Sequence, residues 1–268
     1  MQTNLRLRDA SGTPIPLESD DSKRLLTKIV GLRGLSTQRI VERDKVARHG
    51  SVVEGPTYLQ HKLITLDGEF WGTDWDDAMA QYDAVNGALF DALLTERELL
   101  FDDGSLQLKV LVRPYGDMKS IFNQVGNQIV YQQQLVAPDV FCLSQTPHSL
   151  TADTPVGGSY VLTPTNAGTA GASPIITITG PGTTPPVILN NTTGQNITTH
   201  TSAAVLGGGD TMVIDVFARS ITLTGAERDD LIDFGATQWW DLSKGDNNLS
   251  MLATGGATFS VAWRDTYL

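Results

Sequence analysis

Short runs of alternating apolar and polar residues dominate the first half of the chain. Such runs, bounded by Gly, Pro, Asn and Asp, predict β-strands joined by turns. The segment LLFDDGSLQLKVLV is typical of a hairpin, because two β-rich runs flank an Asp-Gly pair. The strands expected here are residues 5–8, 25–32, 62–66 (ended by Asp67-Gly68), the two runs around Asp103-Gly104, and residues 127–137 before Pro138.

One segment has a helical period instead. Its apolar residues recur at steps of three and four, which places them on one face of a helix. Thr73 or Asp74 can cap the first turn, where Asp76 and Asp77 also suit the positive end of the helix dipole. We therefore predict one α-helix over about Asp74–Leu94, and we interpret these carboxylates as capping groups. The expected buried face consists of Trp75, Ala78, Met79, Tyr82, Val85, Leu89, Ala92 and Leu93.

From about Thr146 the chain becomes rich in Thr, Gly, Asn and Pro. Short strands follow one another at regular spacing with no amphipathic helix between them, which predicts a β-sandwich. Residues 147–158, PHSLTADTPVGG, are the expected linker. We therefore expect a mainly β fold with two domains, residues 1–145 and 146–268. The expected strands of the second domain are residues 160–162, 175–179, 187–189, 196–199, 212–216, 220–224 and 258–263.

Charge supports this division. Fifteen of the 19 Lys and Arg residues lie in residues 1–145, and the formal net charge of the whole chain is −11. An acidic chain is a poor ligand for nucleic acid, because phosphate binding needs clustered Lys and Arg. The first residues lack the apolar core of a signal peptide, so synthesis and retention in a cytoplasm are expected. The single cysteine, Cys142, is expected to be a small buried side chain.

No sequence pattern indicates catalysis, a metal site or a cofactor. No Gly-x-Ser-x-Gly elbow is present, and the triplet Gly207–Gly209 is followed by Asp210 and not by Lys and Ser. We therefore predict a protein that is not an enzyme and binds neither metal nor cofactor. The histidines are scattered without zinc-ligand spacing: His49, His61, His148 and His200.

The pair Trp239-Trp240 is the best candidate for a binding surface. In a strand, adjacent residues face opposite sides, so one indole would lie in the core and the other would be exposed or at an interface. Core or interface packing is the main interpretation, and stacking on a sugar is the alternative. The sequons at Asn190, Asn191 and Asn196 are interpreted as turn chemistry.

An ordered set of segments resembles a known family. The segments are residues 31–70 (GLRGLSTQRIVERDKVARHGSVVEGPTYLQHKLITLDGEF), 99–117 (LLFDDGSLQLKVLVRPYGD), 166–197, 207–225 (GGGDTMVIDVFARSITLTG) and 239–252 (WWDLSKGDNNLSML). Together they are similar to the distal tail (Dit) proteins of siphoviruses, the long-tailed, non-contractile bacteriophages, and in particular to those of actinobacterial phages. The family usually has an Arg and a small residue before the ITL strand, where this chain has Gln60 and Lys62.

The resemblance implies a structural minor tail protein at the virion tail tip, made in the host cytoplasm. Its N-terminal domain, of β-sandwich type with one helix, would form a homohexameric ring between the tail tube and the tail-tip or baseplate hub. Its C-terminal domain would be a galectin-like β-sandwich outside the ring. The implied partners are other copies of the chain, the major tail tube protein, the tail-tip hub (tail-associated) protein, and further the tape measure protein and other tip proteins. DNA would only pass through the lumen, which suits an acidic chain.

The segment Ala47–Gly55 is expected at a ring or tube interface under this hypothesis. The candidate interface residues are Arg48, His49, Gly50, Glu54 and Tyr58, and the candidate sugar or protein contacts are Trp239 and Trp240. One alternative is a carbohydrate-binding module that aids attachment to the host surface. The other is a glycan-cleaving enzyme, which needs two carboxyl groups about 5–10 Å apart in a cleft. No pattern in the sequence indicates which two carboxyl groups these would be.

Overall fold

The computed structural model describes residues 4–19, 23–33, 38–39, 42–44, 51–53, 58–153, 159–182, 184–200, 206–252 and 256–268. The chain divides into two compact units, and each is described by itself. The N-terminal unit comprises residues 1–145 with Leu268, and the C-terminal unit comprises residues 146–267. The fold is mainly β with one α-helix, which confirms the predicted fold class. In the described part of the chain, no helix has both the length and the apolar character needed to cross a membrane.

The N-terminal unit is built on one antiparallel sheet. Its strands are β1 (Arg6–Arg8), β2 (Pro14–Pro16), β3 (Arg24–Val30), β8 (Lys62–Trp71), β9 (Arg97–Asp103), β10 (Leu106–Asn123), β11 (Gln128–Ala137) and β12 (Cys142–Ser144). The strand order is β2-β1-β9-β10-β11-β8-β3, and β12 pairs with β10. The 18-residue β10 changes partner along its length: Leu106–Val112 pairs with β9, and Arg113–Asn123 pairs with β11. One strand thus joins the two halves of the sheet.

Two short antiparallel ladders occur in the connection between β3 and β8. In one, β4 (Gln38–Arg39) pairs with β7 (Tyr58–Leu59); in the other, β5 (Glu42–Asp44) pairs with β6 (Ser51–Val53). The segment Ala47–Gly55, expected to be a loop, therefore contains strand β6. Its other residues lie outside the part that the structure describes.

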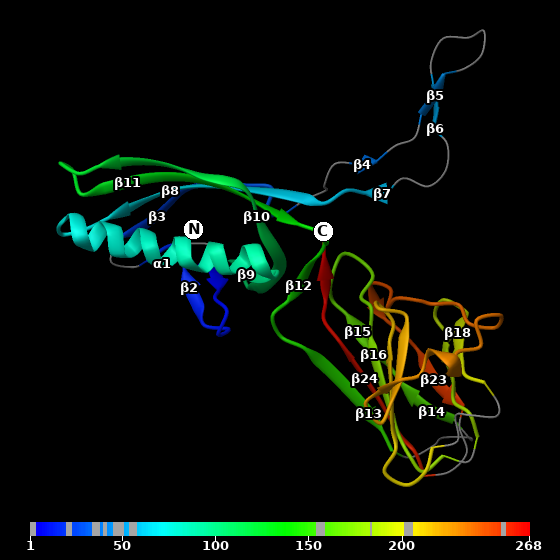
Figure 1. Ribbon diagram of the computed structural model, residues 1–268. Coiled ribbons are helices and arrows are strands. Elements are labelled where there is room, and N and C mark those ends of the chain that lie inside the picture. The colour runs from blue at the N-terminus through cyan, green and yellow to red at the C-terminus, as the bar shows by residue number, and fades with distance from the viewer. Residues whose placement is uncertain are drawn as a thin grey trace. The chain divides into compact units, whose positions relative to one another are not determined.

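The predicted helix is confirmed as α1 (Trp75–Leu94), and Figure 1 shows it lying along the sheet. Asp74 is its N-cap, and the Asp74 Oδ1 atom accepts a hydrogen bond from the Asp77 backbone N–H at 2.8 Å. The buried stripe includes Ala78, Val85, Leu89 and Ala92. Leu93, expected on this face, is instead 54% exposed, because the last turn rotates it to the edge of the stripe.

The strand that was expected to end at Asp67-Gly68 continues to Trp71. Gly68 serves close packing and not a turn: a Cβ atom there would lie 2.7 Å from Tyr131 Cε1 on the neighbouring strand. The Tyr131 ring, packed beside Gly68, stacks on Phe70 with ring centroids 4.6 Å apart. The Asp-Gly pair was therefore misinterpreted, because its glycine makes room for an aromatic side chain.

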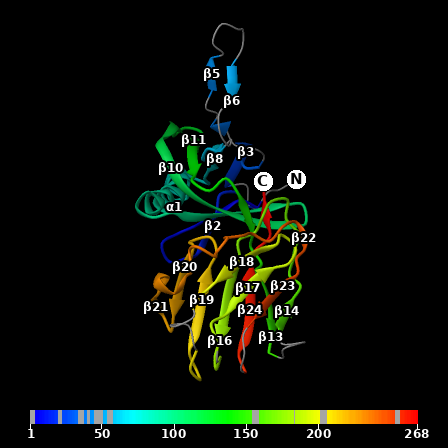
Figure 2. The same ribbon diagram turned by 90° about the vertical axis from the view of Figure 1, so that its right-hand side faces the viewer.

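The C-terminal unit is a β-sandwich, as predicted. One sheet has the order β13 (His148–Ala152), β24 (Thr258–Trp263), β16 (Ile175–Thr179), β19 (Thr211–Asp215), β20 (Ser220–Leu223), β21 (Ala226–Glu227), and Figure 2 shows these strands side by side. The second sheet has the order β14 (Ser159–Leu162), β23 (Leu249–Leu252), β17 (Val187–Asn190), β18 (Gln195–Thr198). Smaller elements are β15 (Thr165–Asn166), the 3-10 helix η1 (Asp229–Leu231), β22 (Gly245–Asp246) and β25 (Thr266–Tyr267).

Alternating side chains from both sheets form one core. Ile176 and Ile178 of β16 are fully buried, as are Ile188 of β17 and Ile197 of β18. All seven expected strands of this unit occur within a residue or so of their predicted bounds. The expected linker was wrong in part, because residues 148–152 form β13 and pair with β24.

Asn166 fixes the chain beside this core. It is fully buried, and its Nδ2 atom donates to the backbone oxygens of Ala170 at 2.8 Å and Leu242 at 3.0 Å. Its Oδ1 atom accepts from the Gly168 backbone N–H at 3.0 Å. One amide thus bonds to three backbone groups of irregular segments, one of which, the Leu242 carbonyl oxygen, also accepts from the Ala172 backbone N–H at 3.0 Å.

Two glycines of the N-terminal unit should respond oppositely to alanine. Gly31 has φ +83°, and a Cβ atom there would lie 2.0 Å from the Leu63 carbonyl oxygen, so Gly31→Ala should destabilise by more than about 1 kcal/mol. Gly87 is exposed within α1 with open space around it, so Gly87→Ala should stabilise by up to about 1 kcal/mol. Calorimetric melting of both variants tests this, and equal shifts of the same sign would contradict it.

Asp77 should make stability depend on pH. Hydrogen bonds from the Thr73 backbone N–H at 3.0 Å and from Lys23 Nζ lower the pKa of its carboxyl well below the ordinary value. The stabilisation is present above the unfolded pKa of about 3.9 and is lost as the pH falls through the folded pKa. Asp77→Asn should therefore lower Tm near neutral pH, and its difference from the parent should shrink in acid. A difference that stays constant across the titration would refute this role.

Removing the Asn166 amide should be costly. Asn166→Ala removes the hydrogen bonds of Asn166 to the Gly168 N–H and the Ala170 carbonyl oxygen, and one of the two bonds to the Leu242 carbonyl oxygen, so it should destabilise the C-terminal unit by about 3 kcal/mol. Asn191→Ala is the control, because the exposed Asn191 side chain bonds to Asn248 and Ser250 where water can replace it, and it should cost less than about 1 kcal/mol. Urea unfolding followed by tryptophan fluorescence distinguishes the two. Equal costs would show that the Asn166 hydrogen bonds add nothing.

Candidate functional site

The predicted interface residues fall mostly outside the described part of the chain. The structure does not describe Arg48, His49, Gly50 and Glu54. Tyr58 is the first residue of strand β7, and only its backbone is described. Their role at an interface stays a prediction. The described residues do show other surfaces on which an assembly contact can be built.

Four neighbouring strands of the N-terminal unit form a sheet with two unpaired edges among the described residues. The order is β3-β8-β11-β10, where β3 pairs only with β8 and the Arg113–Asn123 part of β10 pairs only with β11. Unpaired edges present free N–H and C=O groups that can pair with another chain. We call this set of strands the open sheet.

One face of the open sheet packs on α1, and the other face carries both polar and exposed apolar side chains. Leu66, Gly68 and Phe70 of β8 are buried on the helix side, so the alternating Asp67 and Glu69 lie on the helix-free face. Gln132 Nε2 donates to Asp67 Oδ1 at 2.8 Å, and Gln128 Nε2 donates to Glu69 Oε2 at 3.0 Å. Hydrogen-bonded glutamine amides and carboxylates therefore share this face with exposed apolar side chains such as Leu63, Val130 and Ile121.

Apolar side chains are exposed at one end of the open sheet. The turn between β10 and β11 carries Val125, which is 99% exposed, and Ile121 and Phe122 at the end of β10 are also exposed. Phe122 makes edge-to-face contacts with Trp75 and Tyr82 of α1. An exposed apolar group of this kind is typical of a contact surface.

Cys142 is a buried thiol next to a buried amine. Lys62 Nζ lies 3.9 Å from its Sγ atom, and both side chains are almost fully buried. Burial raises the pKa of the Cys142 thiol, against the opposing effect of the Lys62 charge. A raised pKa disfavours a nucleophilic thiolate. Among the described residues, no cluster of three His, Cys, Asp or Glu side chains could hold a metal.

The two tryptophans have different environments. Trp240 is 3% exposed and belongs to the core, whereas Trp239 is half-buried and packs against that core. They lie in an irregular segment and not in a strand, so the alternation expected for them does not apply. The segment is held by a hydrogen bond from the Gln238 backbone N–H to the Asn196 carbonyl oxygen, at 2.8 Å, and by the bridge between Ala172 and Leu242.

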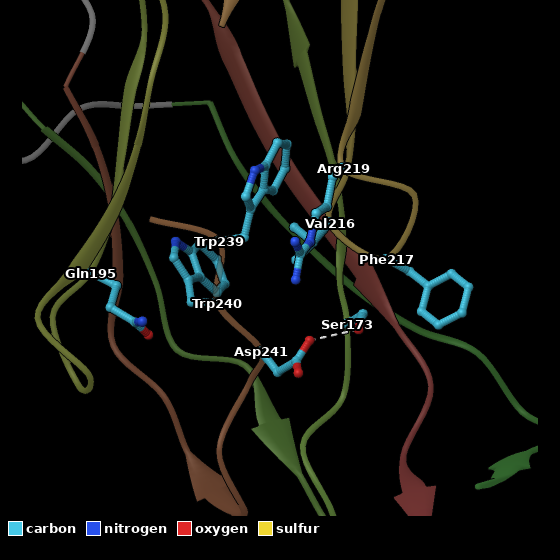
Figure 3. A pocket seen from close by; sticks show the side chains of 8 residues that line it. All are labelled: Ser173, Gln195, Val216, Phe217, Arg219, Trp239, Trp240 and Asp241. Atoms are coloured by element: carbon cyan, nitrogen blue, oxygen red, sulfur yellow. Dashed lines mark hydrogen bonds between the residues drawn. The ribbon is translucent and has the colours of Figure 1, made fainter. Parts of the chain in front are cut away.

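Both indoles line a surface hollow of about 450 Å³ in the C-terminal unit, shown in Figure 3. We call it the tryptophan hollow. Its walls come from four places in the sequence: the approach to β16, the start of β18, the β19–β20 loop and the irregular segment 239–241. The lining residues are Ser173, Gln195, Val216, Phe217, Arg219, Trp239, Trp240 and Asp241.

The polar groups of the tryptophan hollow have unused hydrogen-bonding capacity. Asp241 Oδ1 accepts from Ser173 Oγ at 2.5 Å. Within the described part of the chain, the side chains of Arg219 and Gln195 make no hydrogen bond or ion pair. Figure 3 shows the Arg219 side chain directed into the hollow near both indoles, while Phe217 points away from it.

Sequence reasoning found the tryptophans of this hollow and missed its polar groups. Gln195, Arg219 and Asp241 are far apart in the sequence, and only the fold brings them together. A partial signal was present in the β19–β20 loop. Phe217 is an apolar residue in a hairpin turn and is 71% exposed.

Comparison with known proteins gives a family match within the C-terminal unit. Residues 167–267 match the family model of the siphovirus-type tail component, C-terminal domain (SPP1_Dit). A comparison with the sequences of curated proteins gives no match.

Solved structures with the same fold cover both units. The crystal structure of SPP1 Dit (gp 19.1), described as a paradigm of the hub adsorption apparatus in phages that infect Gram-positive bacteria, matches with a TM-score of 0.70 at 14% identity, over 98% of this chain and 99% of that one. A chain of the phage P2 baseplate in its activated conformation with Ca matches with a TM-score of 0.51 at 12% identity, over 98% of both chains. Residues 167–267 therefore match the siphovirus-type tail component, C-terminal domain, and the whole chain shares the fold of SPP1 Dit.

Proposed function

We propose that this chain is a distal tail protein that forms a ring joining the phage tail tube to the tail-tip or baseplate hub. The N-terminal unit is the ring-forming domain, with six copies expected, and the C-terminal unit is a galectin-like domain outside the ring. The family match of residues 167–267 and the shared fold of SPP1 Dit support this function. The chain acts as a structural component and not as an enzyme.

The observation that carries the proposal is the pair of unpaired edges on the open sheet. If β3 of one copy pairs with the Arg113–Asn123 part of β10 in the next, each copy uses two different edges of the same sheet. Such a heterologous contact closes into a ring when the rotation between copies divides a full turn. Closure also protects edges that would otherwise cause aggregation.

The helix-free face of the open sheet suits the wall of a DNA channel. Asp67 and Glu69 offset the charge of Lys28 and Lys119, which lie on the same face by strand register. Arg113 also lies on this face, and its charge is offset by an ion pair with Glu96 at 3.2 Å. Without net positive charge, this face would not hold phosphates. We infer that it faces the lumen and that α1 faces outward.

The proposed neighbours are other copies of this chain in the ring, the tail tube protein on one side and the tail-tip hub protein on the other. The tape measure protein and other tip proteins are further candidates. This places the protein at the virion tail tip. The exposed apolar group of Ile121, Phe122 and Val125 is a candidate axial contact, because it lies at one end of the open sheet.

Ring assembly tests the proposal. Light scattering during size-exclusion chromatography, with electron microscopy of the large species, should show closed rings, in the presence of the tube protein if a template is needed. Replacement of residues 49–55 by a Gly/Ser linker should abolish rings, because this segment is the proposed subunit or tube contact. The same replacement of residues 191–194, a turn of the C-terminal unit, should leave them intact. Normal rings with the 49–55 linker would remove that segment from the interface.

A further inference from the structure

We propose that the tryptophan hollow binds a neutral saccharide unit. This inference is independent of ring assembly, because every lining residue belongs to the C-terminal unit. The volume of about 450 Å³ falls within the range of about 300–1,000 Å³ that is usual for small-molecule sites.

The polar groups of the hollow match the hydroxyl groups of a sugar. A hydroxyl both donates and accepts, so neighbouring hydroxyls can accept from a guanidinium and donate to a carboxylate at once. Arg219 supplies the unpaired guanidinium, Asp241 has a second carboxylate oxygen beside the one bonded to Ser173, and Gln195 offers a free amide on the other side of the hollow. Charged partners of this kind make the stronger hydrogen bonds.

The aromatic groups supply an apolar wall. Trp239 is half-buried, so part of its ring faces the hollow, and Trp240 closes the inner side. The C–H face of a sugar ring can pack on an indole face while its hydroxyls bond to the polar groups, because ligand sites combine apolar walls with a few placed polar atoms. The Trp240 Nε1 atom is buried and has no partner among the described residues, so the protein alone does not satisfy the polar atoms here.

The backbone of Arg219 is fixed by its turn. Its φ of +56° is uncommon for a residue other than Gly. Asp215 Oδ1 accepts from the Ala218 backbone N–H at 2.9 Å and shapes the same turn. The turn therefore fixes the backbone from which the exposed Arg219 side chain extends toward the hollow.

Charge favours a neutral ligand. Residues 146–268 contain ten Asp and Glu residues but only Arg219, Arg228, Lys244 and Arg264 as cations. Arg228 is paired with Asp230: its Nε and Nη2 atoms donate to the two carboxylate oxygens at 2.8 and 3.0 Å. Because Asp241 also lies in the hollow, an acidic sugar would meet a repulsive field.

The test uses the full chain and saturation-transfer NMR with maltose, cellobiose, lactose and N,N′-diacetylchitobiose. Each is titrated to about 20 mM, well above the roughly 1 mM Kd of a weak single site. At least one sugar should give a saturable signal. Arg219→Gln and Trp239→Ala should each weaken its binding at least ten-fold.

Matched controls separate the hollow from general effects. Arg228→Gln removes a paired arginine of the same unit, and Trp71→Ala removes a half-exposed tryptophan of the other unit, and neither should change the Kd. Arg219→Gln changes an exposed side chain, so its fold can be verified by an unchanged Tm. No saturable signal from any of the four sugars, or equal affinity of the parent and Arg219→Gln, would overturn the proposal.

Discussion

The backbone pairing of β10 is the constraint on which the N-terminal unit depends. Its first part is held by β9 and its second part by β11, so two groups of strands become one sheet without a break in the chain. The helix α1 then packs on one face, with Phe122 of β10 against Trp75 and Tyr82. The same arrangement leaves the second part of β10 unpaired on its other side. The strand pairing that stabilises the sheet therefore also leaves free the edge at which we propose assembly.

In the C-terminal unit, the polar groups of the tryptophan hollow lie on segments outside the core. That core is formed by strand residues whose alternation is regular, and this core supports irregular segments at the surface. Asn166 shows how: one buried amide holds the Leu242 carbonyl oxygen next to the segment that carries Trp239 and Asp241. Loops of different strands can then present Gln195, Arg219 and Asp241 to one hollow without participating in the core.

Local periodicity made most of the fold predictable from the sequence. The helix and its cap at Asp74, the turn at Asp103-Gly104 and the alternation of β11 all follow from residues near one another in the chain. The errors arose where a distant residue decides the outcome. Gly68 marks packing by Tyr131 and not a turn, and residues 148–152 form a strand because β24 pairs with them.

The candidate sites show the same limit. Two adjacent tryptophans can be noticed in a sequence, but the guanidinium, amide and carboxylate beside them come from positions 195, 219 and 241. The unpaired edges of the open sheet are likewise a property of strand order. No single segment of the sequence reveals that β3 lies last in the sheet or that β10 changes partner.

Hydrogen exchange of the assembled protein tests the central claim most directly. The backbone amides of β3 and of the Arg113–Asn123 part of β10 would be compared between the isolated chain and assembled rings or tails. If copies join through the edges of the open sheet, both segments gain protection together on assembly, because their free N–H groups become paired. Assembled particles in which these two edges exchange as fast as in the isolated chain would contradict the account.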